Sequence, residues 1–497
     1  MAKKAIDPTS MTRNETLVLK YAVISRILVL GLTLLWRSFL EPYDTSAAVD
    51  PPCLRPNEIA GDYPPPKFAA AAKILENGIV WDSVYFVRIA QCGYEYEQTY
   101  AFLPLLPFCI SVLSRSVFAP LVPVIGLRAV MALCGYVVSN LAFLLAAIYL
   151  FRLSVIILKD PEAALRASIL FCFNPASIFY SSIYSESLYA LFSIGGVYHL
   201  ISGTSSIAVF WFALSGFARS NGVLNAGYIC FRTMHRAYDA LYMKRRIHLV
   251  VQVVITGFLQ CVCICLPFVA FQAYGYYNIC HGRNRDEVRP WCKARVPLLY
   301  NFIQSHYWGV GFLRYFQFKQ LPNFLLASPI LSLAVCSILS YVKSRPELFL
   351  SLGFQASNEE KRSTSRLFYL EDIAESEVTR SPGKTSSNMG NHDIRQRKPS
   401  RARDAPAEPK APENFGFLSA AVFPFVVHLG LLTATAFFVM HVQVATRFLS
   451  ASPPLYWFAS YLMAAPKHRR WGYMIWTYCA AYILLGSLLF SNFYPFT

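Results

Sequence analysis

Six stretches of this 497-residue chain are apolar over lengths that can cross a lipid bilayer as a helix. Such a helix needs about 20 predominantly apolar residues. The six stretches are Tyr21–Leu40, Leu121–Phe151, His248–Gln272, Leu321–Tyr341, Phe415–Met440 and Trp471–Phe490. Because shorter apolar stretches lie between them, we expect an all-α integral membrane protein, a multi-pass helical bundle with about 11 or 12 transmembrane segments.

The charge of the chain agrees with this class. Charged residues make up 15% of the sequence, whereas soluble domains carry about 25%. The formal net charge is +17, and basic residues gather in the loops 231–246 and 467–470 between apolar stretches. Cytosolic loops of membrane proteins are enriched in Lys and Arg. We therefore attribute the positive charge to cytosolic loops and expect no nucleic-acid partner.

The apolar pattern divides the chain into four parts. They are an N-terminal tail (1–20), a first membrane region (21–342), a polar insert (343–415) and a C-terminal membrane region (416–497). The insert is rich in Ser, Lys, Arg, Glu, Asn and Pro. A segment of this composition buries too little apolar surface to offset its ordering entropy. We therefore predict that the insert is disordered.

The same charge pattern predicts the orientation. The tail 1–20 has more basic than acidic residues, which places it in the cytosol together with the insert. The first apolar stretch has no small-residue cleavage site after it and is predicted to remain as an anchor. It would carry the loop 41–101 to the opposite, non-cytosolic side, and alternation places the loop 273–315 and the segment 441–453 there too.

Four of the 13 cysteines lie in these non-cytosolic loops. An oxidising lumen permits disulfides between Cys53 and Cys92 and between Cys280 and Cys292. The second pair is favoured, because it closes a short polar loop. No Cys/His spacing in the chain matches a zinc site, so no metal is expected.

Asp82 is the foremost candidate for chemistry. It follows Trp81, lies among aromatic residues and precedes a return to apolar sequence. Ionisable residues beside membrane spans are costly and are usually functional. Other polar or aromatic residues interrupt apolar stretches that the topology brings to the same side: Glu186, Arg219, Asn221, Gln304, His306, Trp308, Arg314, Gln443 and Arg447. We expect them to line one lumenal cavity as substrate-binding residues.

One carboxylate, several arginines and several aromatic rings suit the transfer of a sugar from a phosphate-activated donor. A carboxylate can accept the proton of a sugar hydroxyl, and arginine binds phosphate oxygens. We assign Asp82 as the general base with Trp81 beside it. Arg219, Arg314 and Arg447 are the candidate phosphate ligands.

Structural roles are the alternatives. Asp82 could cap the helix that follows it. Glu186 could cap a helix or pair with Arg219. Arg314 and Arg447 could be interfacial residues whose charged ends reach toward water.

The order of these motifs resembles the GPI mannosyltransferase 2 (PIG-V) family. The matching motifs are Trp81–Asp82, Gly93–Tyr94, Phe102–Pro107, Phe173–Ala176, Tyr184–Glu186, Ala218–Gly222, Trp308–Tyr315, Leu321–Ala327 and His441–Leu449. One motif alone would be weak, but the ordered set is specific and extends from about residue 20 to the end of the chain. The insert 343–415 and the first residues have no counterpart in it.

The resemblance implies a GT-C fold in the endoplasmic reticulum membrane, with an active site built from lumenal loops. It implies dolichyl phosphate mannose as the donor, no further cofactor, and a mono-mannosylated GPI glycolipid as the acceptor of an α-1,6 bond. A β-linked donor and an α-linked product imply inversion, which needs one base. The lumenal acidic residue of the family corresponds to Asp82. A small membrane partner subunit is a further expectation.

Three other functions compete with this one. The chain could be another dolichyl-phosphate-sugar transferase of the same fold, acting on N-glycan precursors or on protein. It could be a transporter, although no inverted repeat is visible. It could also be a non-catalytic subunit, which the intact Trp81–Asp82 pair argues against.

Overall fold

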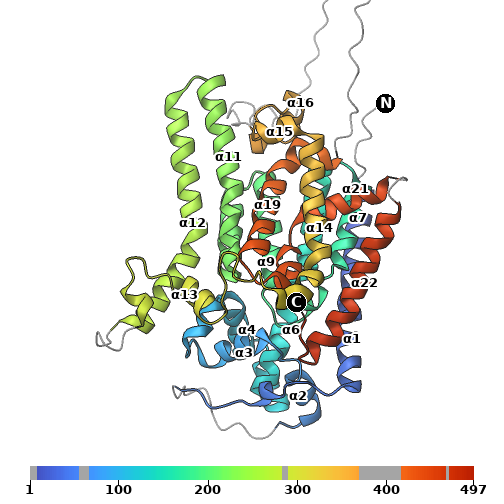
Figure 1. Cartoon of the computed structure of the whole chain (residues 1–497), viewed down its shortest axis with the longest axis vertical. Coiled ribbons are helices and arrows are strands. Elements are labelled where there is room, and N and C mark those ends of the chain that lie inside the picture. The colour runs from blue at the N-terminus through green and yellow to red at the C-terminus, as the bar shows by residue number, and fades with distance from the viewer. Residues whose placement is uncertain (1–7, 55–65, 282–288, 369–415, 466–468, 497) are drawn as a thin grey trace, which may run out of the picture.

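Long helices run between the two ends of the molecule, and shorter helices fill the space between them (Figure 1). The computed structural model describes residues 8–54, 66–281, 289–368, 416–465 and 469–496, and these contain helices and turns but no β-strand. The α-helices are α1 (Pro8–Phe39), α2 (Ala69–Glu76), α3 (Asp82–Cys92), α4 (Leu105–Arg115), α5 (Val122–Ile125), α6 (Leu127–Leu158), α7 (Pro161–Cys172), α8 (Ser177–Ser181), α9 (Glu186–Ile201), α10 (Ser205–Ala218), α11 (Ala226–Tyr238), α12 (Ile247–Cys280), α13 (Leu299–His306), α14 (Leu321–Ser344), α15 (Pro346–Leu350), α16 (Asn358–Ser363), α17 (Ser365–Phe368), α19 (Phe423–Phe438), α20 (Ala445–Leu449), α21 (Pro453–Ala464) and α22 (Arg469–Ser491).

Six helical segments in the described residues are long and apolar enough to cross a membrane. They coincide with the six predicted apolar stretches and comprise α1, α6, α12, α14, α19 and α22. A seventh is reached if α4 and the following helical residues 119–125 form one span bent by 67°. The all-α multi-pass prediction is confirmed, but the expected total of about 11 or 12 segments is not met by this criterion.

The difference in number arises because polar breaks divide the remaining apolar sequence into short helices. The longest of these, α9, has 16 residues and is therefore about 24 Å long, whereas the hydrocarbon core of a bilayer is about 30 Å thick. Helix α7 ends just before Asn174, α9 begins at Glu186, and α10 ends where Arg219 adopts an extended conformation. The breaks therefore end helices inside the bundle.

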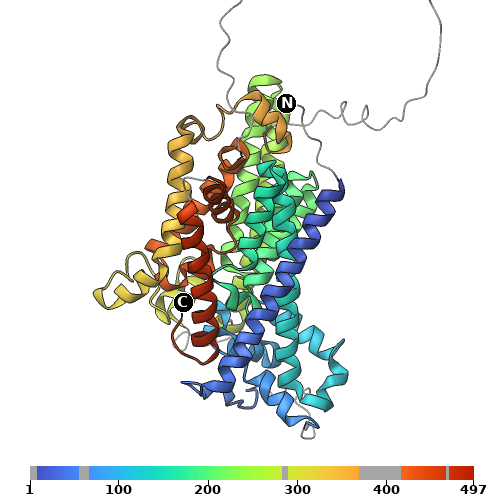
Figure 2. The same ribbon diagram turned by 90° about the vertical axis from the view of Figure 1, so that its right-hand side faces the viewer.

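The two ends of the bundle hold different parts of the chain. The start of α1, α15 and α16 lie at one end, and α2, α3, α4 and α13 lie at the other (Figures 1 and 2). The described residues of the predicted cytosolic insert thus lie at the opposite end of the molecule from those of the predicted lumenal loops 41–101 and 273–315. Which side of a membrane each end faces stays a prediction.

Arg26 connects α1 to the interior of the bundle. It is only 4% exposed and donates hydrogen bonds to the carbonyl oxygen of Ser177 and the hydroxyl of Ser181, each at 2.9 Å. Its guanidinium also lies 3.9 Å from the ring centre of Phe143. Buried charges need such partners. Arg26 therefore holds α8, and the broken stretch around it, against the first membrane helix.

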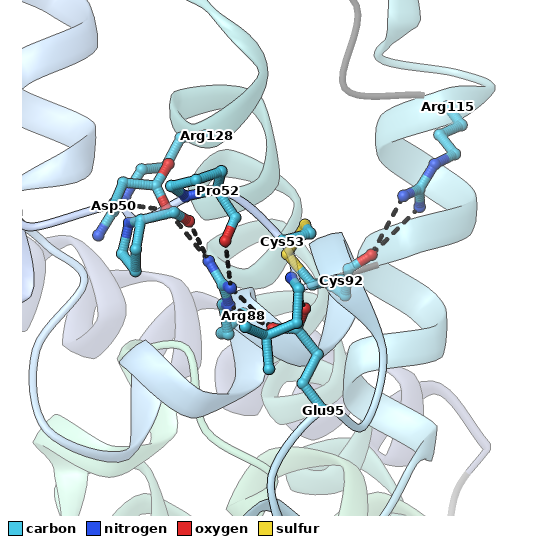
Figure 3. The surroundings of a disulfide bond; sticks show 11 residues. Asp50, Pro52, Cys53, Arg88, Cys92, Glu95, Arg115 and Arg128 are labelled. Atoms are coloured by element: carbon cyan, nitrogen blue, oxygen red, sulfur yellow. Dashed lines mark hydrogen bonds and ion pairs between the residues drawn. A yellow bond between two sulfur atoms is a disulfide. The ribbon is translucent and has the colours of Figure 1, made fainter. Parts of the chain in front are cut away.

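Both candidate disulfides are present, Cys53–Cys92 and Cys280–Cys292. The first joins the end of α3 to the segment that follows α1 (Figure 3). Arg88 supports this join, because it donates to Glu95 at 2.7 Å and to the carbonyl oxygen of Pro52 at 3.1 Å. Helix α3 is thus fixed at its C-terminal end.

The predicted disorder of the insert 343–415 is wrong for its first part, where α15, α16 and α17 form. Helix α16 begins with a capping box of Ser357 and Glu360, which satisfies backbone N–H groups that the helix leaves unpaired. Glu360 also accepts a hydrogen bond from Arg345 at 3.0 Å. Residues 369–415 lie outside the described residues.

Candidate active site

A cavity of about 410 Å³ is lined by residues from six separate parts of the chain, within 81–103, 179–185, 218–220, 300–310, 440–447 and 490–496. The first five parts lie at the polar breaks noted in the sequence, and the sixth is the C-terminal segment with Phe490 and Phe496. The predicted site residues that line it are Trp81, Asp82, Arg219, Gln304, Trp308, Gln443 and Arg447. The structure therefore brings together residues that are up to 366 positions apart in the sequence, from Trp81 to Arg447.

Asp82 is placed by a sharp turn at the start of α3. Trp81 has a φ of 53°, in the left-handed region that bulky residues rarely occupy. Its indole N–H donates to the carbonyl oxygen of Phe490 at 3.1 Å, and the backbone N–H of Asp82 donates to the hydroxyl of Tyr184 at 3.0 Å. These bonds hold the turn in place and leave the Asp82 side chain at the edge of the cavity.

Asp82 does not cap α3. The helix begins at Asp82 itself, its cap position is Trp81, and no side chain makes a capping hydrogen bond there. The carboxylate instead accepts a hydrogen bond from Arg447 at 3.0 Å. The side chain of Asp82 is 34% exposed, so it remains accessible from the cavity. This arrangement favours a chemical role over a capping role.

Behind Asp82 lies a second carboxylate, Glu186. Its side chain is 2% exposed, and it forms ion pairs with Arg219 and, at 3.7 Å, with Arg447. The predicted pairing of Glu186 with Arg219 is therefore present. Burial alone would lower the pKa of Arg447, but Asp82 and Glu186 raise it above its usual value. Two carboxylates and two guanidiniums thus form one charge cluster with one carboxylate open to the cavity.

The turn that carries Arg219 depends on a glycine. A Cβ on Gly222 would clash with the backbone of Ser215 and Gly216. The close approach lets residues 220–225 fold as a short 3-10 helix after α10. Asn221, one of the predicted site residues, is 8% exposed in this turn and does not line the cavity.

Two further predicted residues lie away from the cavity lining. His306 is exposed and stacks on Phe302, with 4.9 Å between ring centres. Arg314 is exposed in the loop between α13 and α14. The structure therefore gives no support to Arg314 as a phosphate ligand.

Gln443 is oriented by a chain of hydrogen bonds. The Asn323 amide donates to the Tyr315 hydroxyl, which donates to Oε1 of Gln443, both at 2.7 Å. This chain orients the amide of Gln443, whose side chain lines the cavity.

Sequence reasoning missed most of the aromatic residues that line the cavity. They include Tyr85, Phe102, Phe179, Tyr184, Phe490 and Phe496. Tyr85 could have been found, since it lies one helical turn after Asp82 and shares its face. No local pattern indicates that Phe490 and Phe496 line the same cavity as Trp81.

Comparison with known proteins identifies similar chains. The family described as Mannosyltransferase (PIG-V) matches residues 13–497. GPI alpha-1,6-mannosyltransferase 2 of Homo sapiens is 30% identical over 477 residues, which cover 92% of this chain and 85% of that protein. GPI mannosyltransferase 2 of Drosophila pseudoobscura pseudoobscura is 29% identical, covering 84% of this chain and 86% of that protein. No solved structure gives a significant match.

Proposed function

Because the chain belongs to the PIG-V mannosyltransferase family, we propose that it takes mannose from dolichyl phosphate mannose at the lumenal face of the endoplasmic reticulum membrane. The chain is a mannosyltransferase of GPI-anchor biosynthesis that forms an α-1,6 bond. Its substrates are lipid-linked and reach it in a membrane. The acceptor is the mono-mannosylated GPI precursor, which receives its second mannose.

Asp82 is the general base of this reaction. The acceptor's 6-hydroxyl oxygen attacks C1 of the donor mannose, its proton passes to the Asp82 carboxylate, and the C1–O bond to phosphate breaks. The bonding electrons leave with the dolichyl phosphate. Proton removal by a positioned side chain contributes about 10²–10⁴-fold to such a reaction. Asp82 suits this role because its carboxylate is accessible from the cavity, whereas Glu186 is buried.

Arg447 is the arginine best placed for the donor phosphate. It lines the cavity beside Asp82, and its Nε atom has no hydrogen-bond partner in the described part of the chain. That atom is itself buried, but the Arg447 side chain is 19% exposed overall, so other guanidinium atoms can meet a ligand oxygen in the cavity. Arg219 also lines the cavity, but it is paired with Glu186.

The observation that carries the proposal is the cavity in which Asp82 and Arg447 meet at 3.0 Å. Two assays test it. Purified protein should form product from dolichyl phosphate mannose and not from GDP-mannose, and cells that lack the protein should accumulate the mono-mannosylated GPI precursor. Accumulation of any other intermediate would contradict the acceptor assignment. Use of GDP-mannose alone would contradict the donor assignment.

The two disulfides support a lumenal cavity. One disulfide ends at Cys92, the last residue of α3, and the other at Cys292, shortly before α13; α3 and α13 lie at the same end of the bundle, and stable disulfides form in oxidising compartments such as the lumen. An N-glycosylation acceptor engineered near position 58 should be modified, and one placed within 380–395 should not. The reverse result would put Asp82 in the cytosol and exclude a lumenal mechanism.

A further inference from the structure

The loop between α13 and α14 carries large apolar side chains on its surface. In residues 312–318, which we call the aromatic loop, Phe318 is 100% exposed and Phe312 is 70% exposed. Leu313 and Phe316 are 44% and 43% exposed. Soluble proteins rarely expose such a group of side chains, and apolar patches of this kind mark sites of contact with a membrane or with another protein.

The aromatic loop lies where two candidate membrane spans end. One candidate span ends at Phe438, and another begins at Phe318. The backbone N–H of Leu313 donates to the carbonyl oxygen of Phe438 at 2.7 Å. The ring centres of Phe312 and Phe316 lie 6.3 Å and 6.4 Å from that of Phe438. These contacts fix the loop at the level of a membrane boundary.

Two basic side chains accompany the apolar ones. Arg314 and Lys319 are exposed, and neither pairs with a carboxylate among the residues that the structure describes. Residues 288–346 and 414–497, which include α14 and α19, contain no Asp or Glu. The helices against which the loop packs therefore supply no negative charge. The phosphate groups of lipid headgroups carry such a charge, and arginine binds phosphate through paired N–H groups.

The aromatic loop also contacts residues of the cavity. Tyr315 donates a hydrogen bond to Gln443 at 2.7 Å and stacks on His441, with 4.6 Å between ring centres. Both partners line the cavity. The loop therefore has an exposed apolar part and a part that touches the cavity lining.

We propose that the aromatic loop is a lipid-binding surface. Phe312 and Phe318 insert among the lipids of the leaflet at the cavity end of the molecule. Arg314 and Lys319 contact the phosphate groups of phospholipid headgroups in the same leaflet. Large apolar residues beside basic residues are typical of segments that lie in a membrane interface. The loop would hold the cavity next to the membrane surface, whatever the identity of the donor and the acceptor.

Photo-cross-linking of the purified full chain in phosphatidylcholine vesicles tests this proposal. The photoreactive residue p-benzoylphenylalanine, placed at Phe312 or Phe318, should form covalent adducts with phosphatidylcholine that mass spectrometry detects. Phe68 is the matched control, because it is 62% exposed and precedes α2, the labelled helix farthest from α15 and α16 in Figure 1. The control position should give no lipid adduct. The absence of adducts at both loop positions, or an equal yield at position 68, would overturn the proposal.

The basic residues are tested in vesicles that contain equal amounts of phosphatidylcholine and phosphatidylglycerol. Adducts at position 318 should favour the anionic lipid by about fivefold, because one basic residue near a membrane surface is worth about 1 kcal/mol. Arg314→Glu combined with Lys319→Glu should abolish this preference, whereas Arg314→Lys should keep it. An unchanged preference in the double variant would overturn the role of the two basic residues. In cell membranes, adducts with a protein in place of phospholipid would overturn the proposal and assign the loop to a protein partner.

Discussion

Helix α3 carries a charge cluster at each end, and the two clusters differ in how completely they are paired. At its first residue, Asp82 joins Arg447, Glu186 and Arg219 in the cavity cluster. Near its last residue lies the staple cluster, which consists of Arg88, Glu95, Asp50, Arg128 and the Cys53–Cys92 disulfide.

The charged groups of the staple cluster are engaged in structural contacts, whereas the cavity cluster keeps a charged group available to a ligand. Arg88 hydrogen-bonds Glu95 and two backbone carbonyls and pairs with Asp50 at 3.9 Å. In the cavity cluster, Glu186 is buried and forms ion pairs with Arg219 and Arg447, whereas the Asp82 side chain is 34% exposed and lines the cavity. Because the cavity cluster presents one carboxylate to the cavity, we infer that the staple cluster holds α3 in place and that the cavity cluster acts on substrate.

The comparison is tested most directly by the same substitution, Asp to Asn, made once in each cluster. Asp82→Asn should lower kcat by about 10²–10⁴-fold, because an amide side chain cannot take up the proton of the attacking sugar hydroxyl. Asp50→Asn is the matched control and should keep near-normal activity. Both proteins should be expressed and melt close to the wild type. An active Asp82→Asn enzyme would remove the base mechanism while leaving the fold intact.

The staple cluster should respond in stability. Cys53→Ser and Cys92→Ser should each destabilise the folded protein by about 2–4 kcal/mol, the usual effect of losing a disulfide. The double variant should be no worse than either single variant, since the bond is already lost. Thermal unfolding in detergent measures this effect, with Cys263→Ser, an exposed free cysteine, as the control. Normal melting of Cys53→Ser would show that the disulfide does not hold α3.

Conservative arginine substitutions sharpen the comparison within the cavity. Arg447→Lys should lower activity by about 10- to 100-fold, since hydrogen bonds to charged groups are worth about 1.5–3 kcal/mol and lysine lacks the planar fork. Arg219→Lys should lower activity less, because Arg219 is already engaged in an ion pair with Glu186. Arg314→Lys should match the wild type. A larger loss for Arg314→Lys than for Arg447→Lys would reject this placement of the phosphate.

The smallest effect is expected for a substitution of Glu97. It tests whether a fully paired charge cluster in another part of the molecule has only a structural role. It accepts hydrogen bonds from Arg289 at 3.0 Å and from Trp291 and Tyr307, each at 2.7 Å. Burial alone would raise the pKa of Glu97, but these donors hold it below the ordinary value. An acid with a lowered pKa stabilises the folded state above its unfolded pKa, about 4.3, and this contribution is lost as pH falls through the folded pKa.

Melting of the wild type and Glu97→Gln at several pH values measures this contribution. The difference in stability should be constant between pH 7 and 5 and should shrink below about pH 4, as the carboxyl becomes protonated in both states. Activity at pH 7 should change little. A difference that grows as the pH falls would contradict the sign of the pKa shift.

Much of the membrane architecture could be predicted from the sequence, because a long run of apolar residues is explained by one structure, a membrane-spanning helix. The six long stretches became six candidate spans. The remaining segments were overcounted, because composition cannot tell a full span from a 12- to 16-residue helix that ends at a polar break inside the bundle. The same limit explains the insert, where the capping box at Ser357 and Glu360 was a readable signal that overall composition concealed.

The cavity could be predicted only in part. Polar residues that interrupt apolar sequence are costly, so Asp82, Arg219 and Arg447 stood out and lie together. Arg314 has the same local appearance but lies outside the cavity lining, because its direction depends on the loop after α13. The place of Phe490 in the cavity could not be predicted, since the bond from Trp81 to Phe490 joins residues 409 positions apart.

The buried arginine of α1 has a consequence for how the protein is made. Arg26 bonds to residues 146 to 155 positions later in the chain, so it enters the membrane before its partners exist. A lone arginine at the centre of a membrane helix costs about 2.5–3.5 kcal/mol on insertion scales. At about 5–20 residues per second, synthesis of the missing partners takes roughly 10–30 s. We expect nascent chains that stop before residue 177 to retain this unsatisfied charge and to be recognised by the cell as incomplete.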